Sequence, residues 1–175
     1  AKIEGLNPGG SVKDRTALSM VMDGIREGRL RRGMRILEAT SGNTGIGYSW
    51  ICAAMGIGVT LCVPANASPE RFAILKAHGA EIVKTDPLEA TDGSQRIARE
   101  IKAADPEKWF YPDQYSNDAN WRVHFQTTGP ELWEQCEGQI DYFVAGLGTG
   151  GTFSGIAKYL KQMNPKIQCI GVDPY

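Results

Sequence analysis

The chain has 175 residues, 42% of them apolar, and a formal net charge of -1. This length and apolar content suffice for one domain with a buried core, or for part of a larger protein. Charges of both signs are mixed along the sequence without a basic block, which argues against nucleic acid or an anionic membrane as the main partner.

The apolar runs, such as 57–63 and 140–145, are far shorter than the ~20 residues that a membrane-spanning helix needs. No secretory signal is recognisable, and the four cysteines form no C-x-x-C pair, so we expect structural thiols in a cytoplasmic protein. The sequence begins without methionine and stops directly after a strand-like segment. We therefore expect it to be a piece of a longer protein.

Helix-periodic and strand-like segments alternate along the chain, which is typical of an α/β fold with a mostly parallel sheet. Leu18, Val21, Met22 and Ile25 have the spacing of an amphipathic helix over 14–27. A strand at 35–39, a helix at 43–56 and a strand at 58–64 follow. Ser68 as N-cap then predicts a helix that starts at 69 and ends at Gly79, before a strand at 80–85.

Two later helix starts are predicted from capping boxes, in which a polar side chain precedes Glu or Gln by three residues. Asp92 with Gln95 predicts one start, and Thr128 with Glu131 predicts the start of a helix that ends at Gly138. A strand at 140–145, a helix at 153–161 and a strand-like end complete the chain.

Three glycine-marked loops each lead into a predicted helix, and two of them leave a strand, where open α/β sheets bind ligands. In "GLGTGGT" (146–152), several backbone N–H groups can approach one anion at the positive end of a helix dipole, which predicts a phosphate site. Gly146, Gly148 and Gly151 also satisfy G-x-G-x-x-G, and Asp173 follows near a strand end. A dinucleotide-binding oxidoreductase therefore remains an alternative at this point.

The other two loops offer different chemistry. "TSGNTG" (40–45) places hydroxyl and amide groups between two glycines, which suits a carboxylate or a phenolic oxygen. "NPGGSVKDR" (7–15) contains Lys13 near the start of a predicted helix, where the helix dipole opposes a positive charge. The pKa of its amine can be lowered there, which allows the amine to act as a nucleophile. The neighbouring Asp14 and Arg15 are expected to make helix-start or ion-pair contacts. His78 and His124 lack metal-ligand spacing, so no metal is predicted.

The three motifs in this order resemble the pyridoxal-phosphate enzymes of the cysteine synthase and cystathionine β-synthase family. The resemblance covers essentially the whole chain, including "DQYSNDAN" (113–120) and "TTGPELWEQ" (127–135). It implies fold type II, with two open, mostly parallel twisted sheets flanked by helices, here as an incomplete fragment. It also implies a large-domain part at 1–12, a smaller mobile domain at 13–117 and a second large-domain part at 118–175.

The resemblance further assigns residue roles. Lys13 matches the lysine that forms a Schiff base with pyridoxal 5'-phosphate and later moves the substrate's α-proton, and Asn43 matches the contact to the pyridine 3'-oxygen. Gly9 and Gly10 would leave room for the cofactor ring. The remaining assignments are the substrate carboxylate for Thr40, Ser41, Gly42, Thr44 and Gln114, and the cofactor phosphate for Gly148, Thr149, Gly150, Gly151 and Thr152.

The implied reaction makes L-cysteine from O-acetylserine, or a similar O-activated serine, and sulfide. Cystathionine formation from serine and homocysteine is the alternative, because the C-terminal segment reads more like that branch of the family. A nicotinamide-binding fragment and a non-catalytic scaffold are the remote alternatives. The implied partners are small-molecule substrates, a second copy in a homodimer and, as for cysteine synthases of the family, a serine acetyltransferase.

Overall fold

The computed structural model describes residues 1–40 and 42–173, which form two compact units. The N-terminal unit comprises Ile3–Asp113, and the C-terminal unit comprises Ala1–Lys2 together with the residues from Gln114 onward. Each unit contains its own parallel sheet flanked by helices, so the expected α/β class with two open parallel sheets is confirmed. None of the helices described is long and apolar enough to cross a bilayer.

The N-terminal unit is built on a four-stranded sheet in the order β3-β2-β1-β4, with every pair parallel. Ile36 lies opposite Val59, and Leu61 lies opposite Ile82. Its elements are η1 (Glu4–Leu6), α1 (Lys13–Arg26), β1 (Arg35–Ala39), α2 (Asn43–Met55), β2 (Val59–Pro64), α3 (Pro69–Ala77), β3 (Glu81–Thr85), η2 (Pro87–Glu89), α4 (Ala90–Ala104) and β4 (Trp109–Phe110).

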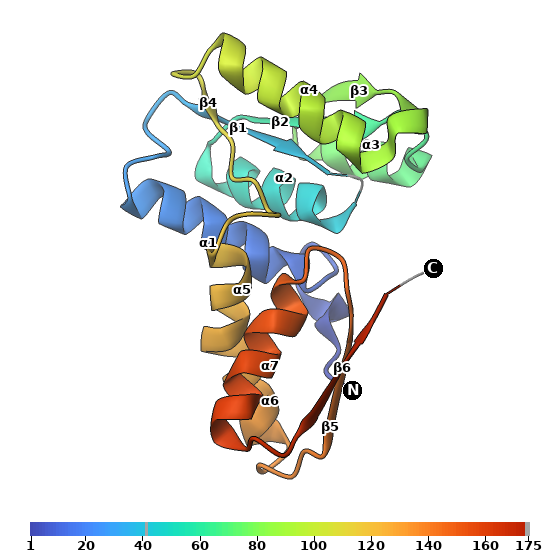
Figure 1. Ribbon diagram of the computed structural model, residues 1–175. Helices are drawn as coiled ribbons and strands as arrows, with labels where there is room; N and C mark the ends of the chain where they lie inside the picture. The colour runs from blue at the N-terminus through green and yellow to red at the C-terminus, as the bar shows by residue number, and fades with distance from the viewer. Residues whose placement is uncertain (41, 174–175) are drawn as a thin grey trace. The chain divides into compact units, whose positions relative to one another are not determined.

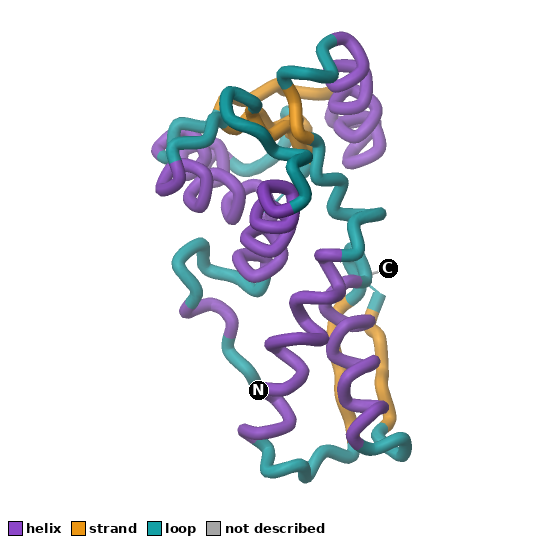
Figure 2. The backbone as a smooth tube through the Cα atoms, turned by 90° about the vertical axis from the view of Figure 1, so that its left-hand side faces the viewer, coloured by secondary structure: helices purple, strands orange, loops and turns teal. Residues whose placement is uncertain are grey.

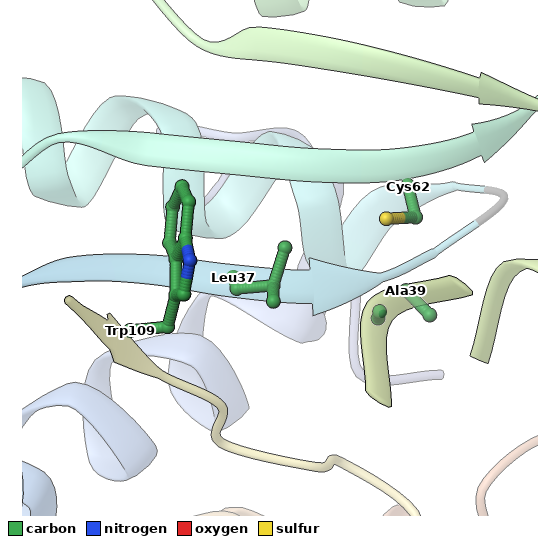
Figure 3. Packing of buried hydrophobic residues seen from close by; sticks show 5 residues of the cluster. Leu37, Ala39, Cys62 and Trp109 are labelled. Atoms are coloured by element: carbon green, nitrogen blue, oxygen red, sulfur yellow. The ribbon is translucent and has the colours of Figure 1, made fainter. Parts of the chain in front are cut away.

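Helices cover both faces of this sheet, with α4 on one side and α2, backed by α1, on the other (Figures 1 and 2). All six residues of β2 are buried, as expected for a central strand of a parallel sheet. Figure 3 shows the core under α4, where Leu37, Ala39, Cys62 and Trp109 pack together.

The predicted helix at 14–27 is confirmed as α1, but its buried side differs from the apolar spacing. Ala17, Met20 and Val21 are buried, whereas Leu18 and Met22 remain more than a third exposed. The reason is the close packing of α1 on α2, where a Cβ on Gly47 would lie 3.0 Å from that of Ala17. The buried side of α1 is thus set by its packing on α2, and Leu18 and Met22 lie beside that contact.

The C-terminal unit consists of a two-stranded parallel sheet packed against helices. Phe143, Ile156, Leu160 and Ile167 form its core. Its elements are α5 (Ala119–Val123), the π-helical segment η3 (His124–Thr128), α6 (Gly129–Gln135), β5 (Tyr142–Gly146), α7 (Gly151–Met163) and β6 (Gln168–Val172).

The helix start predicted at Thr128 is wrong. α5, η3 and α6 follow one another without a break, so Thr128 lies inside a continuous helical rod with helical backbone angles. Its hydroxyl contacts His124 Nδ1 at 2.9 Å instead of capping a helix. The start predicted at Asp92 is also wrong, because α4 begins at Ala90 without a side-chain cap.

The start predicted at Ser68 is confirmed. Its side chain accepts a hydrogen bond from the Arg71 N–H, and Pro69 occupies the first turn of α3. Local capping signals thus succeed where the chain enters a helix from a loop.

Two of the cysteines are predicted to be unreactive in the native protein. Burial raises the pKa of Cys52 to about 12 and that of Cys62 to about 11, so little nucleophilic thiolate forms at pH 8. Cys136 is exposed. Alkylation followed by mass spectrometry should modify Cys136 quickly and the two buried thiols only after unfolding. Equal native rates for Cys62 and Cys136 would contradict the packing.

Candidate active site

Lys13 is the first residue of α1 and is half-buried. Burial lowers the pKa of its ammonium group below the ordinary 10.5, because the charged form loses hydration. The sequence suggested the helix dipole as the cause, but loss of solvent accounts for the shift. The lowered pKa increases the neutral, nucleophilic share of the amine at a given pH.

The loop before Lys13 is held by the buried carboxylate of Asp14. Its Oδ2 accepts a hydrogen bond from the Gly9 N–H at 2.6 Å, and its Oδ1 accepts from Trp50 Nε1 at 3.1 Å. A Cβ on Gly9 would overlap Asp14 Oδ1 and lie 2.9 Å from Trp50 Nε1. On the Cβ side of Gly9 the protein's own side chains therefore fill the space, whereas a Cβ on Gly10 would meet no atom within 4 Å.

Arg15 and Asn7 hold the same loop from its other end. Arg15 forms a two-pronged ion pair with Glu4, at 2.8 and 3.0 Å, and Asn7 Nδ2 donates to Glu4 Oε2 at 2.7 Å. The expected helix-start and ion-pair roles of Asp14 and Arg15 are confirmed. The backbone that carries Lys13 is thus fixed on both sides.

The loop from 40 to 45 joins β1 to α2 in the same unit. Thr40 is buried, and its Oγ1 accepts from the Gly42 N–H at 3.2 Å. Asn43 is exposed as the first residue of α2, while Thr44 is buried. Ser41 lies outside the described residues. No side chain among the described residues caps α2, so its first N–H groups can bind an anion.

Because α1 packs on α2, the Lys13 backbone lies beside α2, the helix that follows the loop at 40–45. A Cβ on Gly47 would lie 3.3 Å from the Lys13 carbonyl oxygen. Arg71 of α3 adds a charge that the sequence pattern did not reveal, since its guanidinium carbon lies 3.6 Å from the position of a Cβ on Gly42. This cation borders the loop predicted to hold a carboxylate.

The C-terminal unit contains the loop predicted to hold phosphate, between β5 and α7. Gly150 precedes α7 with φ +80, and no side chain among the described residues caps this helix. A Cβ on Gly148 would meet no atom within 4 Å. Open space beside the N-terminus of a helix is the arrangement that binds a phosphate or another anion.

Gln114 lies in this unit as well. It is buried, and its backbone oxygen accepts a hydrogen bond at 2.7 Å from the Asn120 side chain, which also contacts Thr149. The same residues border a cavity of about 110 Å³ together with Gly150 and Gly151. Asn120 was not predicted as a site residue, although it is the last residue of the segment 113–120 that carries part of the resemblance.

Comparisons with known proteins agree with this arrangement. The family described as "Pyridoxal-phosphate dependent enzyme" matches residues 1–175. Cysteine synthases from Aquifex aeolicus (strain VF5) and Staphylococcus aureus (strain Mu50) are 53% and 49% identical over 99% of the chain, which covers 53% and 56% of their lengths. The chain thus spans about half the length of these relatives.

A solved structure gives the same result. The crystal structure of a cysteine synthase from Entamoeba histolytica matches with a TM-score of 0.93 and 38% identity, over 99% of this chain and 51% of that one.

Replacing Asp14 is predicted to destabilise the lysine loop. Asp14→Ala leaves the Gly9 N–H and Trp50 Nε1 without their acceptor, which should lower the free energy of unfolding by about 2–3 kcal/mol. Asp23→Ala is the control, since it removes only a surface pair with Arg26 and should cost less than about 1 kcal/mol. Urea unfolding of both variants measures the difference, and equal losses would refute the anchoring role.

Proposed function

This chain belongs to the family of pyridoxal-phosphate dependent enzymes, and from that membership we propose that the protein containing it makes L-cysteine. The proposed substrates are O-acetylserine, or a similar O-activated serine, and sulfide. The observation that carries the proposal is the half-buried amine of Lys13, whose pKa is lowered. The chain that contains this lysine is 53% identical to a cysteine synthase over 99% of its length.

The residues present fit the cofactor. An amine with a lowered pKa suits covalent capture of an aldehyde, and the uncapped start of α7 suits a phosphate. We propose Lys13 as the covalent anchor, Asn43 as the contact to the ring oxygen, and Gly148, Thr149, Gly150, Gly151 and Thr152 as the phosphate loop. Pyridoxal phosphate, when bound, supplies an electron-poor ring that accepts the charge of a substrate carbanion.

The chain's own groups perform the binding and proton steps. Lys13 Nζ, when it is not bound to the cofactor, would act as the base that takes up the substrate's α-proton and holds it at Nζ. The same amine would later return a proton to the product. Thr40, Ser41, Gly42, Thr44 and Gln114 are proposed to orient the substrate carboxylate.

The alternatives raised by the sequence receive less support. The relatives reported above are cysteine synthases, so cystathionine formation is not favoured. A nicotinamide-binding fragment leaves Lys13 without a role.

Several features of the whole protein belong to the same proposal. These are a homodimer, binding of a serine acetyltransferase, a cytoplasmic location and a division at residues 12 and 117 between large and small domains. They rest on resemblance to cysteine synthases.

Replacing Lys13 tests the covalent anchor. The full-length protein should show the visible absorption band of lysine-bound pyridoxal phosphate, and Lys13→Ala should abolish that band without changing the far-ultraviolet circular dichroism. Lys166→Ala, at an exposed position, is the matched control and should keep the band. A band that persists in Lys13→Ala would assign the anchor elsewhere.

The reaction itself is tested by supplying two sulfur nucleophiles separately. With O-acetylserine, the full-length protein should form cysteine from sulfide at least about tenfold faster than cystathionine from homocysteine, a difference of about 1.4 kcal/mol between the two barriers. Product analysis by mass spectrometry provides the measurement. Faster cystathionine formation would favour the alternative reaction.

A further inference from the structure

We propose that the N-terminal unit contains a second binding site, which takes a small carboxylic acid with an apolar chain. The site is a cavity of about 530 Å³ at the amino ends of β1 and β2. The end of α1, the loop that follows it and the turn from α2 to β2 form its walls. Cavities of this size are typical of sites that bind small molecules.

The cavity lies at the opposite edge of the sheet from the loop at 40–45. Arg35, which borders the cavity, is the first residue of β1, and Ala39 at the other end of the strand leads into that loop. Four residues of extended chain separate these positions by about 13 Å. Along α1, the twelve residues from Lys13 to Ile25 span about 18 Å. A ligand in the cavity therefore binds apart from the candidate active site, whatever reaction that site performs.

The apolar part of the lining suits a hydrocarbon chain. It consists of Ile25, Leu30, Met34, Met55 and Ile57. Ile25 and Met55 keep 39% and 41% of their surface exposed, so a ligand that covers them removes further apolar surface from water. The unbranched methionine side chains can also adapt to the shape of a bound chain.

The charged part of the lining suits one carboxylate. Arg31, Arg32 and Arg35 border the cavity, and among the described residues no acidic side chain does. Arg31 pairs with Glu107 at 2.7 Å, and Arg35 pairs with Glu81 at 2.9 Å. Arg32 forms no ion pair or hydrogen bond within the part of the chain that the structure describes. One uncompensated guanidinium matches a single carboxylate, which it can bind through two parallel N–H bonds.

Arg35 offers a further polar contact to such a ligand. Its Nε is buried without a hydrogen-bond partner among the described residues, which is costly for a donor. Its Nη2 donates weakly, at 3.4 Å, to the Val59 oxygen and to Thr60 Oγ1. A Cβ on Gly58 would lie 2.6 Å from Nη1, so this glycine lets the guanidinium lie against the cavity wall. A small shift toward a bound carboxylate would give Nε the acceptor that it lacks.

The helix ends beside the cavity do not require the charge of Arg32. The last carbonyl groups of a helix carry partial negative charge, which a cation can offset. Here the chain itself supplies donors to these groups. The Leu30 N–H donates to the Gly24 oxygen of α1 at 2.8 Å, and the Ile57 N–H donates to the Cys52 oxygen of α2 at 2.8 Å. The charge of Arg32 is thus available to a ligand.

Methyl NMR tests where the ligand binds. In the full-length protein with methyl-¹³C methionine, decanoate should shift the Met34 and Met55 signals with a dissociation constant on the order of 0.1 mM. Met163 is the control, because it is exposed to a similar extent as Met55 but lies in the C-terminal unit. Single methionine-to-leucine variants assign the signals. Met34 and Met55 signals that stay unshifted at about 5 mM decanoate would overturn the proposal.

Removing the Arg32 guanidinium tests the carboxylate contact. Arg32→Ala should weaken decanoate binding about tenfold, because a charge-assisted pair is lost, and should change decanol binding less than about twofold. Arg96→Ala, at an exposed arginine of α4 that does not border the cavity, should leave both affinities within about twofold. Equal losses of decanoate and decanol in Arg32→Ala would overturn the assignment of a carboxylate.

Decanedioate tests the apolar wall without mutation. Its second carboxylate would enter the apolar side of the cavity, so it should bind at least about tenfold more weakly than decanoate. Comparable affinity for the two acids would overturn the assignment of an apolar chain. The visible band of lysine-bound pyridoxal phosphate should stay unchanged when decanoate is added, and displacement of the cofactor would show that the acid binds at the candidate active site instead.

Discussion

Contact between a buried polar side chain and a glycine backbone is the constraint on which the candidate site in each unit depends. In the N-terminal unit the Asp14 carboxylate occupies the space that a Cβ on Gly9 would need, and in the C-terminal unit the Asn120 amide does the same at Gly151. Each contact fixes a helix entrance from within the protein. Gly9 and Gly151, which lie in loops that suggest ligand sites, are therefore required first by neighbouring side chains.

Burial is the cause of the lowered pKa at the lysine. Desolvation lowers the pKa of Lys13, whereas a carboxylate directed at its ammonium group would raise it. The adjacent Asp14 turns its oxygens toward the Gly9 N–H and Trp50 Nε1. Its negative charge is thus used to hold the loop. The same residue can stabilise the backbone without cancelling the shift that makes the amine reactive.

The sequence predicts this fold well where the signal is local. Apolar runs and the Ser68 cap gave the correct strands and helix because neighbouring residues determine them. The side-chain hydrogen bonds that hold the loops were not predicted, because their partners are far apart in the sequence. Asn120 and Thr149 are 29 residues apart, and Trp50 and Asp14 are 36 apart, so no local pattern connects them. The loops could be named from sequence, but the side chains that orient them depend on tertiary packing.

The failed capping box at Thr128 has a physical explanation in the π-helical segment. Pro130 lacks an N–H, and in a regular α-helix its ring would clash with the carbonyl four residues earlier, at Gln126. The wider turn of η3, directly before α6, can relieve that clash and let the rod continue through the proline. Continuity in turn keeps Thr128 next to His124, and so the proline inside the rod helps to place a buried histidine against Thr152 of the loop between β5 and α7.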